Sequence, residues 1–175
     1  MPNALIIGDM QRGFLEEGNP LYCGEGARAI IPKVRALAER ESASGAWLFF
    51  MVDTHDPDDK EFQMWPKHCV GGTTEVEIVP ELADLVEKGE LIPKRRYSAF
   101  FGTDLAKRLA ELKPAKLIFC GVCTDICVMY SVADARFRDY PVEVYTNCVA
   151  TFDPEAHEFA LKHMEKILGA DLKEL

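Results

Sequence analysis

Short apolar segments alternate with amphipathic segments along the whole chain, and this alternation constrains the fold more than any other feature. The apolar segments are bounded by polar or turn residues, as buried strands are, and lie at 4–8, 46–52, 90–94, 116–121 and 142–147. Between them, apolar residues recur at helical spacing, as at Ile30, Val34, Leu37 and Ala38, at Leu105, Leu109 and Leu112, and at Ala160, Met164, Ile167 and Leu168. The alternation predicts an α/β fold in which helices cover both faces of a parallel sheet.

Local signals indicate where two of the helices begin. Pro32 is expected in the first turn of its helix, and the sequence Asp153-Pro154-Glu155 supplies an N-cap, a proline and an acidic residue for the last helix. A further short strand is weakly indicated near residues 170–172. The chain has 175 residues, 48% of them hydrophobic and 28% charged, and shows no internal repeat or linker. We therefore expect a single domain over residues 1–175.

Charge and composition exclude some partners. The formal net charge of −9 argues against nucleic acid, because phosphate contacts need a surplus of Lys and Arg. The first ten residues do not resemble a signal peptide, and no run approaches the roughly 20 apolar residues of a membrane span. We expect a cytoplasmic protein with no membrane partner, and the sequence is compatible with a homo-oligomer. In a reducing compartment the six cysteines should remain thiols, which disfavours a disulfide between Cys123 and Cys127.

Residues capable of chemistry follow the expected strands. Asp9 follows the first, Asp53 and His55 the second, Lys94 the third, and the segment 121–127 the fourth. Parallel sheets form sites at the carboxyl ends of their strands, so these side chains are expected to gather at one edge. The irregular segment from 53 to about 75 is too long for a plain connection, which indicates a functional loop.

The sequence GVCTDICV at 121–128 places two cysteines at a strand-to-helix junction. If Thr124 caps the following helix, Cys127 lies in its first turn, where free N–H groups and the helix dipole stabilise a thiolate. Cys127 could then attack a carbonyl carbon. On position alone, two buried small hydrophobic side chains are the more common outcome. A zinc pair is disfavoured, because the usual spacing is C-x2-C and the chain has no second pair.

A thiol nucleophile needs a group that accepts its proton. The histidines do not obviously serve, because His157 and His163 are expected on the surface of the last helix and His55 and His68 in the long loop. Asp9 is an alternative, since a carboxylate can take the proton while the ammonium of Lys94 holds it in place.

Five collinear stretches resemble the isochorismatase-like cysteine hydrolases, and most of all their nicotinamidase (pyrazinamidase) branch. They lie between residues 5 and 148 and read IIGDMQRGF, VDTHDPDD, MWPKHCVGGT, IPKRRYSAFFGTDL and FCGVCTDICVMYSVADARFRDYPVEVYTN. The resemblance implies a three-layer α/β/α fold with a six-stranded parallel sheet of order 3-2-1-4-5-6. It also implies an amidohydrolase of NAD salvage that converts nicotinamide to nicotinate and ammonia.

The resemblance assigns catalytic roles to three residues. The family's aspartate, lysine and nucleophilic cysteine fall on Asp9, Lys94 and Cys127. Cys123 falls where the family usually has a small residue after a cis peptide bond, so the Val122-Cys123 bond is expected to be cis. The backbone N–H groups of Cys123 and Cys127 would then form the oxyanion hole.

The resemblance also implies a divalent metal, which in this branch holds the pyridine nitrogen of the substrate. Asp53, His55 and His68 match its ligands, and Glu61 stands where a further ligand, usually His, is found. Carboxylate and imidazole suit zinc, with iron or manganese as alternatives. Without the resemblance, the D-x-H sequence before Pro57 would more simply be a turn with a surface histidine.

Aromatic side chains of the family surround a small-molecule amide substrate, and their counterparts here are Phe14, Trp65 and Tyr97. Ordinary packing accounts for these three residues equally well. The chain departs from the family pattern at two positions. Gly8 stands where a β-branched residue is common, and the glycine could loosen the first strand. Cys123 places a second thiol near the nucleophile.

Three alternatives remain open at this point. The enzyme could hydrolyse a carbamoyl or ureido amide, or isochorismate, although isochorismatases often lack the metal ligands. It could be a catalytically idle interaction module, which the intact triad disfavours. A thioredoxin-like redox protein or a zinc-binding protein is disfavoured by the absence of C-x2-C.

Overall fold

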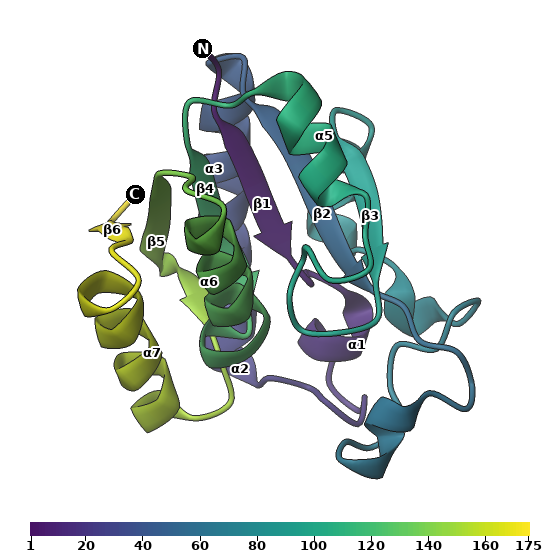
Figure 1. Ribbon diagram of the computed structural model, residues 1–175. Helices are drawn as coiled ribbons and strands as arrows, with labels where there is room; N and C mark the ends of the chain where they lie inside the picture. Colours follow the sequence, from purple (N-terminus) through teal and green to yellow (C-terminus); the bar gives the residue numbers. More distant parts are fainter.

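Six parallel strands form one sheet in the order β3-β2-β1-β4-β5-β6, as the resemblance implied. The computed structural model covers residues 1–175, and Figure 1 shows the twisted sheet between two layers of helices. The strands are β1 (Ala4–Gly8), β2 (Trp47–Asp53), β3 (Glu90–Lys94), β4 (Leu117–Val122), β5 (Val142–Ala150) and β6 (Asp171–Lys173). Five of them match the predicted segments within three residues at each end, and β6 confirms the weak signal near 170–172.

The helices on one side of the sheet are α1 (Arg12–Leu15), α2 (Glu25–Arg28), α3 (Ile31–Ala43) and α4 (Ala83–Val86). Those on the other side are α5 (Leu105–Leu112), α6 (Met129–Phe137) and α7 (Pro154–Lys166). Three 3₁₀ turns, η1 (Lys60–Gln63), η2 (Thr74–Val76) and η3 (Pro80–Leu82), and a π-helical turn, η4 (Thr124–Val128), complete the structure.

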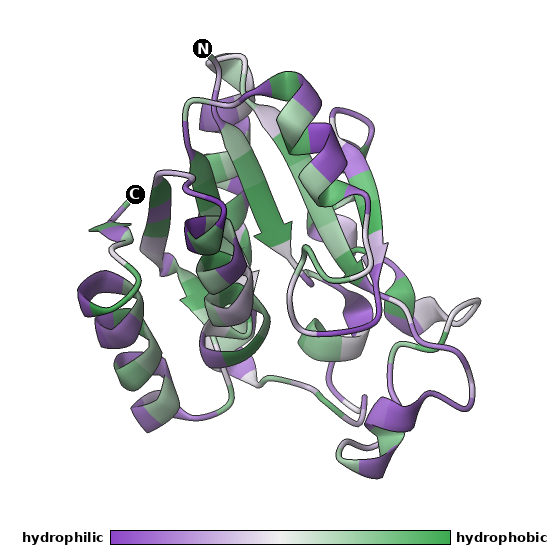
Figure 2. Ribbon diagram, viewed as in Figure 1, coloured by the Kyte–Doolittle hydropathy of each residue, from purple (hydrophilic) through white to green (hydrophobic).

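Alternate residues of the central strands separate the two cores. Leu5 and Ile7 of β1 pack with α3, whereas Ile6 packs with Leu105 of α5 and Val132 of α6. This is the period-2 pattern of a strand buried on both faces. In Figure 2 the central strands are accordingly hydrophobic, and the purple stretches lie on the outer helices and loops. No helix is long and apolar enough to cross a membrane.

The helix signals are largely confirmed. Pro32 lies at the start of α3, and the Asp153 carboxylate accepts a hydrogen bond of 2.9 Å from the N–H of Glu155 at the start of α7. The prediction that Ile167 and Leu168 continue the last helix was wrong. Helix α7 ends at Lys166, and the Ile167 side chain is 69% exposed because the chain turns there toward β6.

Candidate active site

Strand order and register bring the predicted acidic and basic residues together. Asp53 and Lys94 are paired residues at the carboxyl ends of β2 and β3, and Asp9 directly follows the neighbouring strand β1. All three side chains are buried. Asp9 adopts a left-handed backbone conformation, with φ of 49°, as the chain leaves the sheet. The prediction that strand ends gather these side chains at one edge is confirmed.

The ammonium of Lys94 lies at the centre of this group. Its Nζ is 3.1 Å from Oδ2 of Asp9 and donates a hydrogen bond of 3.4 Å to Sγ of Cys127. The three residues of the predicted triad therefore meet around one ammonium group. Lys94 also donates a hydrogen bond of 3.0 Å to Asp53, so the same ammonium contacts a predicted metal ligand.

Burial and nearby charges set the protonation of Asp9 and Cys127. Burial raises the pKa of Asp9 to about 6, even though Lys94 opposes the shift. Burial and the Asp9 carboxylate raise the pKa of the Cys127 thiol well above its ordinary value. The thiolate expected for a cysteine in the first turn of a helix is therefore disfavoured, because desolvation and the Asp9 carboxylate outweigh the Lys94 ammonium. The thiol therefore holds its proton at rest, and the neighbouring Asp9 carboxylate is the group that can accept it during attack.

Cys127 lies in the π-helical turn η4, between β4 and α6. The expected capping role of Thr124 was wrong, because Thr124 is the first residue of this turn and its hydroxyl pairs with Nδ1 of His157 at 2.8 Å. That bond also ties His157, expected on the surface, to the turn. The Val122-Cys123 peptide bond is cis, as predicted. The backbone N–H of Cys123 donates to no protein group, so it is free to bind an oxyanion.

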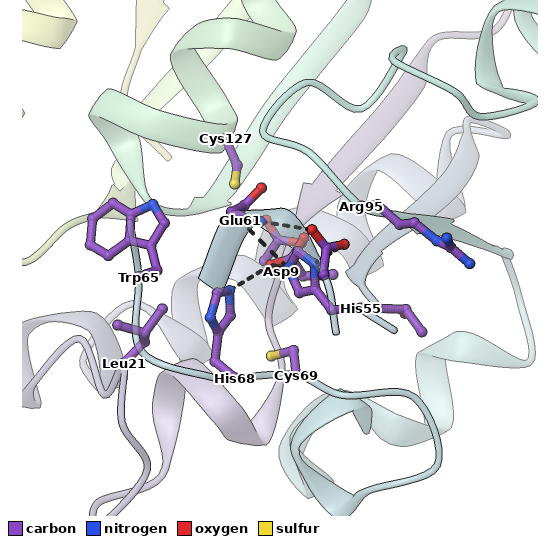
Figure 3. A network of polar contacts seen from close by, with 12 residues as sticks. Asp9, Leu21, His55, Glu61, Trp65, His68, Cys69, Arg95 and Cys127 are labelled. Carbon is purple, nitrogen blue, oxygen red and sulfur yellow. Dashed lines mark hydrogen bonds and ion pairs between the residues drawn. The ribbon is translucent and has the colours of Figure 1, made fainter. Parts of the chain in front are cut away.

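The four predicted metal ligands form one buried cluster. One ligand atom from each of Asp53, His55, Glu61 and His68 lies within 4.8 Å of the others. Figure 3 shows Glu61, His55 and His68 gathered next to Asp9, with the sulfur of Cys127 pointing toward them. Nε2 of His55 and Nε2 of His68 lie 3.0 and 3.3 Å from the same oxygen, Oδ2 of Asp53.

The hydrogen bonds around the two histidines fit a cation at this place. Nδ1 of His68 lies 2.7 Å from the carbonyl oxygen of Pro66, which only accepts, so Nδ1 carries the proton and the Nε2 lone pair faces Asp53. Nδ1 of His55 likewise faces the carboxylate of Asp59 at 3.0 Å. Two imidazole lone pairs directed at one carboxylate oxygen repel it unless a proton or a metal ion lies between them.

The charge of the cluster supports the same conclusion. Burial alone would lower the pKa of His55, yet its bonds with Asp53 and Asp59 raise it to about 9, so the site attracts positive charge. Burial raises the pKa of Glu61, and its Oε2 has no hydrogen-bond partner. The donor set of two carboxylates and two imidazoles therefore fits a divalent ion such as zinc.

Two supporting residues were missed by the sequence reasoning. Gln11 is fully buried, and its amide exchanges two hydrogen bonds with the backbone of Asp53, at 2.8 and 2.9 Å. Asp59 contacts His55, and its carboxylate also caps η1 by accepting a hydrogen bond of 2.9 Å from the N–H of Glu61. The signal for Asp59 was its position four residues after His55 and just before a helical turn. Nothing local distinguished Gln11.

A pocket opens beside Cys127 and reaches the metal cluster. Its lining includes Asp9, Cys127, Asp53, Glu61 and His68 on the polar side. The predicted aromatic residues Phe14, Trp65 and Tyr97 all line it, and Nε1 of Trp65 donates a bond of 2.8 Å to the Tyr97 hydroxyl. Five other residues line the pocket. Cys123 was predicted from the sequence, whereas Leu21, Val122, Ile126 and Phe152 were not predicted as pocket residues.

Known proteins share this sequence pattern and fold. Residues 3–172 match the isochorismatase domain family. An uncharacterized isochorismatase family protein, PncA of Bacillus subtilis, is 35% identical, with 99% of this chain and 100% of that protein covered. The crystal structure of nicotinamidase PncA from Bacillus subtilis superposes with a TM-score of 0.94 at 37% identity, covering 99% and 100% of the two chains.

Two further structures bear on the ligands of this fold. The pyrazinamidase of Pyrococcus horikoshii in complex with zinc has a TM-score of 0.92, 34% identity and complete coverage of both chains. N-carbamoylsarcosine amidase from Thermoplasma acidophilum has a TM-score of 0.89 at 28% identity, covering 99% and 96%. Hydrolases of this fold thus include enzymes for different amides. The match of sequence, sheet order and buried site shows that the chain belongs to the isochorismatase family, as an amidohydrolase-type member.

Proposed function

We propose that the protein is a nicotinamidase, which hydrolyses nicotinamide to nicotinate and ammonia through a thioester on Cys127. The observation that carries the proposal is the pocket itself. One cavity is lined by the thiol, by the carboxylate that can take its proton, by the cluster suited to a metal, and by aromatic walls suited to a flat ring. The nicotinamidases and pyrazinamidase of similar fold support the same substrate class.

The chemistry begins with the three residues around Lys94. Asp9 accepts the thiol proton as Sγ of Cys127 attacks the amide carbonyl carbon, and the N–H groups of Cys123 and Cys127 stabilise the oxyanion. Asp9 then returns the proton to the leaving nitrogen, ammonia departs, and a thioester remains. Asp9 next takes a proton from water, which attacks the thioester; the C–S bond breaks, the acid is released, and Asp9 returns the proton to Sγ of Cys127. Lys94 keeps Asp9 in place and opposes its protonation throughout.

A divalent ion held by Asp53, His55, Glu61 and His68 would supply a Lewis acid for the ring nitrogen of the substrate. Zinc is proposed, with iron or manganese as alternatives of similar ligand preference. Phe14, Trp65 and Tyr97 would contact the faces and edges of the ring.

The pocket also favours a neutral substrate over an anionic one. No Lys or Arg is among its lining residues, and three carboxylates are. An N-carbamoyl amino acid or isochorismate carries at least one carboxylate, which would have no cationic side chain in this pocket to bind it. A neutral heteroaromatic amide avoids that cost, and its anionic product is repelled.

The test is ammonia release from nicotinamide and pyrazinamide by metal-loaded protein, with Cys127→Ala as the control. Release by the wild type that is lost in the variant is the expected result. If the wild type releases no ammonia from either amide although iodoacetamide labels Cys127 quickly, the substrate assignment is wrong and the thiol chemistry stands.

A further inference from the structure

Phe152 differs from every other residue that lines the pocket. It lies between β5 and α7, beyond all the site residues predicted from the sequence, and it is 41% exposed. The other lining residues are buried or half-buried. A residue that is part of the wall and also faces solvent must lie at the mouth of the pocket.

Phe152 faces an aromatic partner across this mouth. Its ring is stacked with that of Trp65, with centroids 6.4 Å apart and an angle of 21° between the planes. In Figure 3, Trp65 lies on the side of the pocket away from Asp9 and His55. The Phe152–Trp65 pair therefore lies on the side opposite the buried ionised groups.

The backbone around Phe152 is held relative to the nucleophile. The hydroxyl of Thr151 donates a bond of 2.5 Å to the carboxylate of Asp125, a residue of the same π-helical turn as Cys127. On the other side, Asp153 caps helix α7. Anchors on both neighbours hold the backbone at Phe152, and the stacking on Trp65 orients its ring.

We propose that Phe152 is a specificity-determining residue that covers the mouth of the pocket and limits the size of the amides that reach Cys127. The proposal rests on the proposed function for its substrate class, flat heteroaromatic amides. When the carbonyl carbon of such an amide lies at Sγ of Cys127, Phe152 shields the outer part of the ring from water. Ring substituents that project toward the mouth collide with the Phe152–Trp65 pair.

The kinetic test uses Phe152→Ala, with Phe159→Ala as matched control, because Phe159 is an exposed phenylalanine of α7 that does not line the pocket. An aromatic contact of this kind changes affinity by about two- to ten-fold. We expect Phe152→Ala to raise the KM for nicotinamide by roughly that factor, with kcat within about two-fold. The ratio of kcat/KM for ring-substituted nicotinamides to kcat/KM for nicotinamide should also be at least about five-fold higher in the variant than in the wild type.

The controls separate a specific role from general damage. Phe159→Ala should match the wild type, and Phe152→Tyr should restore the wild-type KM and selectivity. The proposal is overturned if Phe152→Ala leaves both the KM for nicotinamide and the substrate preference unchanged.

A second readout does not depend on amide hydrolysis. Iodoacetamide and the bulkier iodoacetanilide carry the same reactive group, and Cys127 is the one cysteine that is not buried. Labelling of Cys127, followed by peptide mass spectrometry, gives the rate ratio of the large to the small reagent. We expect Phe152→Ala to raise this ratio by at least about five-fold, since the mouth is wider. If Phe152→Ala leaves this ratio unchanged, the proposal is overturned. If Phe152→Ala raises the ratio but the wild type is inactive on aromatic amides, only the proposed function is overturned.

Discussion

Lys94 and Asp53 are paired in register at the carboxyl ends of β3 and β2, and Nζ of Lys94 lies 3.0 Å from Oδ1 of Asp53. The other carboxylate oxygen of Asp53 faces the two histidines of the metal cluster. Since Lys94 also contacts Asp9 and Cys127, this one pair joins the thiol chemistry to the metal site. A change at either residue should therefore affect both.

Replacing Lys94 with Met keeps much of the side-chain volume and removes the charge. Lys94 opposes the rise in the pKa of buried Asp9, so its loss should raise that pKa further and leave Asp9 protonated at neutral pH. General base catalysis typically contributes about 10²- to 10⁴-fold, so kcat/KM at pH 7 should fall at least about 100-fold. Steady-state kinetics and bound-metal content test this, with exposed Lys88→Met as control. A variant retaining more than half the activity would contradict the role of Lys94.

The pH dependence of kcat/KM should show an acid limb set by Asp9. Its pKa is raised to about 6 by burial, and only the carboxylate form can accept the thiol proton. Protonation increases as pH falls, so activity should be lost below about pH 6, by about ten-fold per unit. Kinetics over about pH 4.5 to 8 test this limb. Metal content is measured at each pH, because loss of the ion would also reduce activity. A midpoint near the ordinary value for an aspartate would argue against Asp9 as base.

The sequence was sufficient for the sheet and for residues that act at the ends of strands. Apolar runs and strand order place Asp9, Asp53 and Lys94 at one edge, because parallel strands end on the same side. Helix α7 shows the limit of periodicity. Ile167 continues the apolar spacing of its helix, yet the helix ends one residue earlier and Ile167 is exposed. Spacing alone does not indicate where tertiary structure ends a helix.

Residues that act through nonlocal contacts were not predictable in the same way. Gln11 binds the backbone of Asp53, 42 residues away, and Phe152 reaches the pocket from a connection beyond the last motif. Their roles depend on which segments become neighbours after folding, and no local pattern encodes this. The raised pKa of Cys127 likewise follows from burial beside Asp9, which outweighs the helix position that the sequence shows.

Gly121 should be far less replaceable than an ordinary turn glycine. Its φ is +106°, and a Cβ there would lie 2.1 Å from the carbonyl oxygen of Gly8 on the neighbouring strand. Gly8 itself lies in a fully buried strand and is paired with Met51 on one side and Gly121 on the other. Gly121→Ala combines strain with a backbone clash and should lower the free energy of unfolding by at least about 3 kcal/mol. Gly45, with φ of +83° and no atom within 4 Å of the added Cβ, is the matched control.

Gly45→Ala carries only the backbone strain, which is about 1 to 2 kcal/mol. Urea unfolding followed by circular dichroism compares the two variants with the wild type. Equal losses for Gly45→Ala and Gly121→Ala would show that β1 and β4 separate easily and that the close approach of Gly8 to Gly121 does not limit the sheet.

Asp59 and Asp58 provide a matched test of the metal cluster. Asp59 holds Nδ1 of His55 at 3.0 Å and the N–H of Glu61 at 2.9 Å, whereas Asp58 is exposed and makes no side-chain bond. Residues that orient metal ligands typically contribute about 10- to 100-fold in metal affinity. Asp59→Ala should therefore weaken zinc binding by that factor, and Asp58→Ala should leave it unchanged.

Competition with a chelator of known affinity gives the zinc dissociation constants without reference to activity. Iodoacetamide labelling of Cys127 should stay close to the wild-type rate in both variants, because Asp9 and Lys94 still surround the thiol. Equal zinc affinity in Asp59→Ala and Asp58→Ala would mean that His55 is oriented without Asp59. A large loss of labelling in Asp59→Ala would instead show that the loop carrying Asp59 supports the nucleophile as well as the metal.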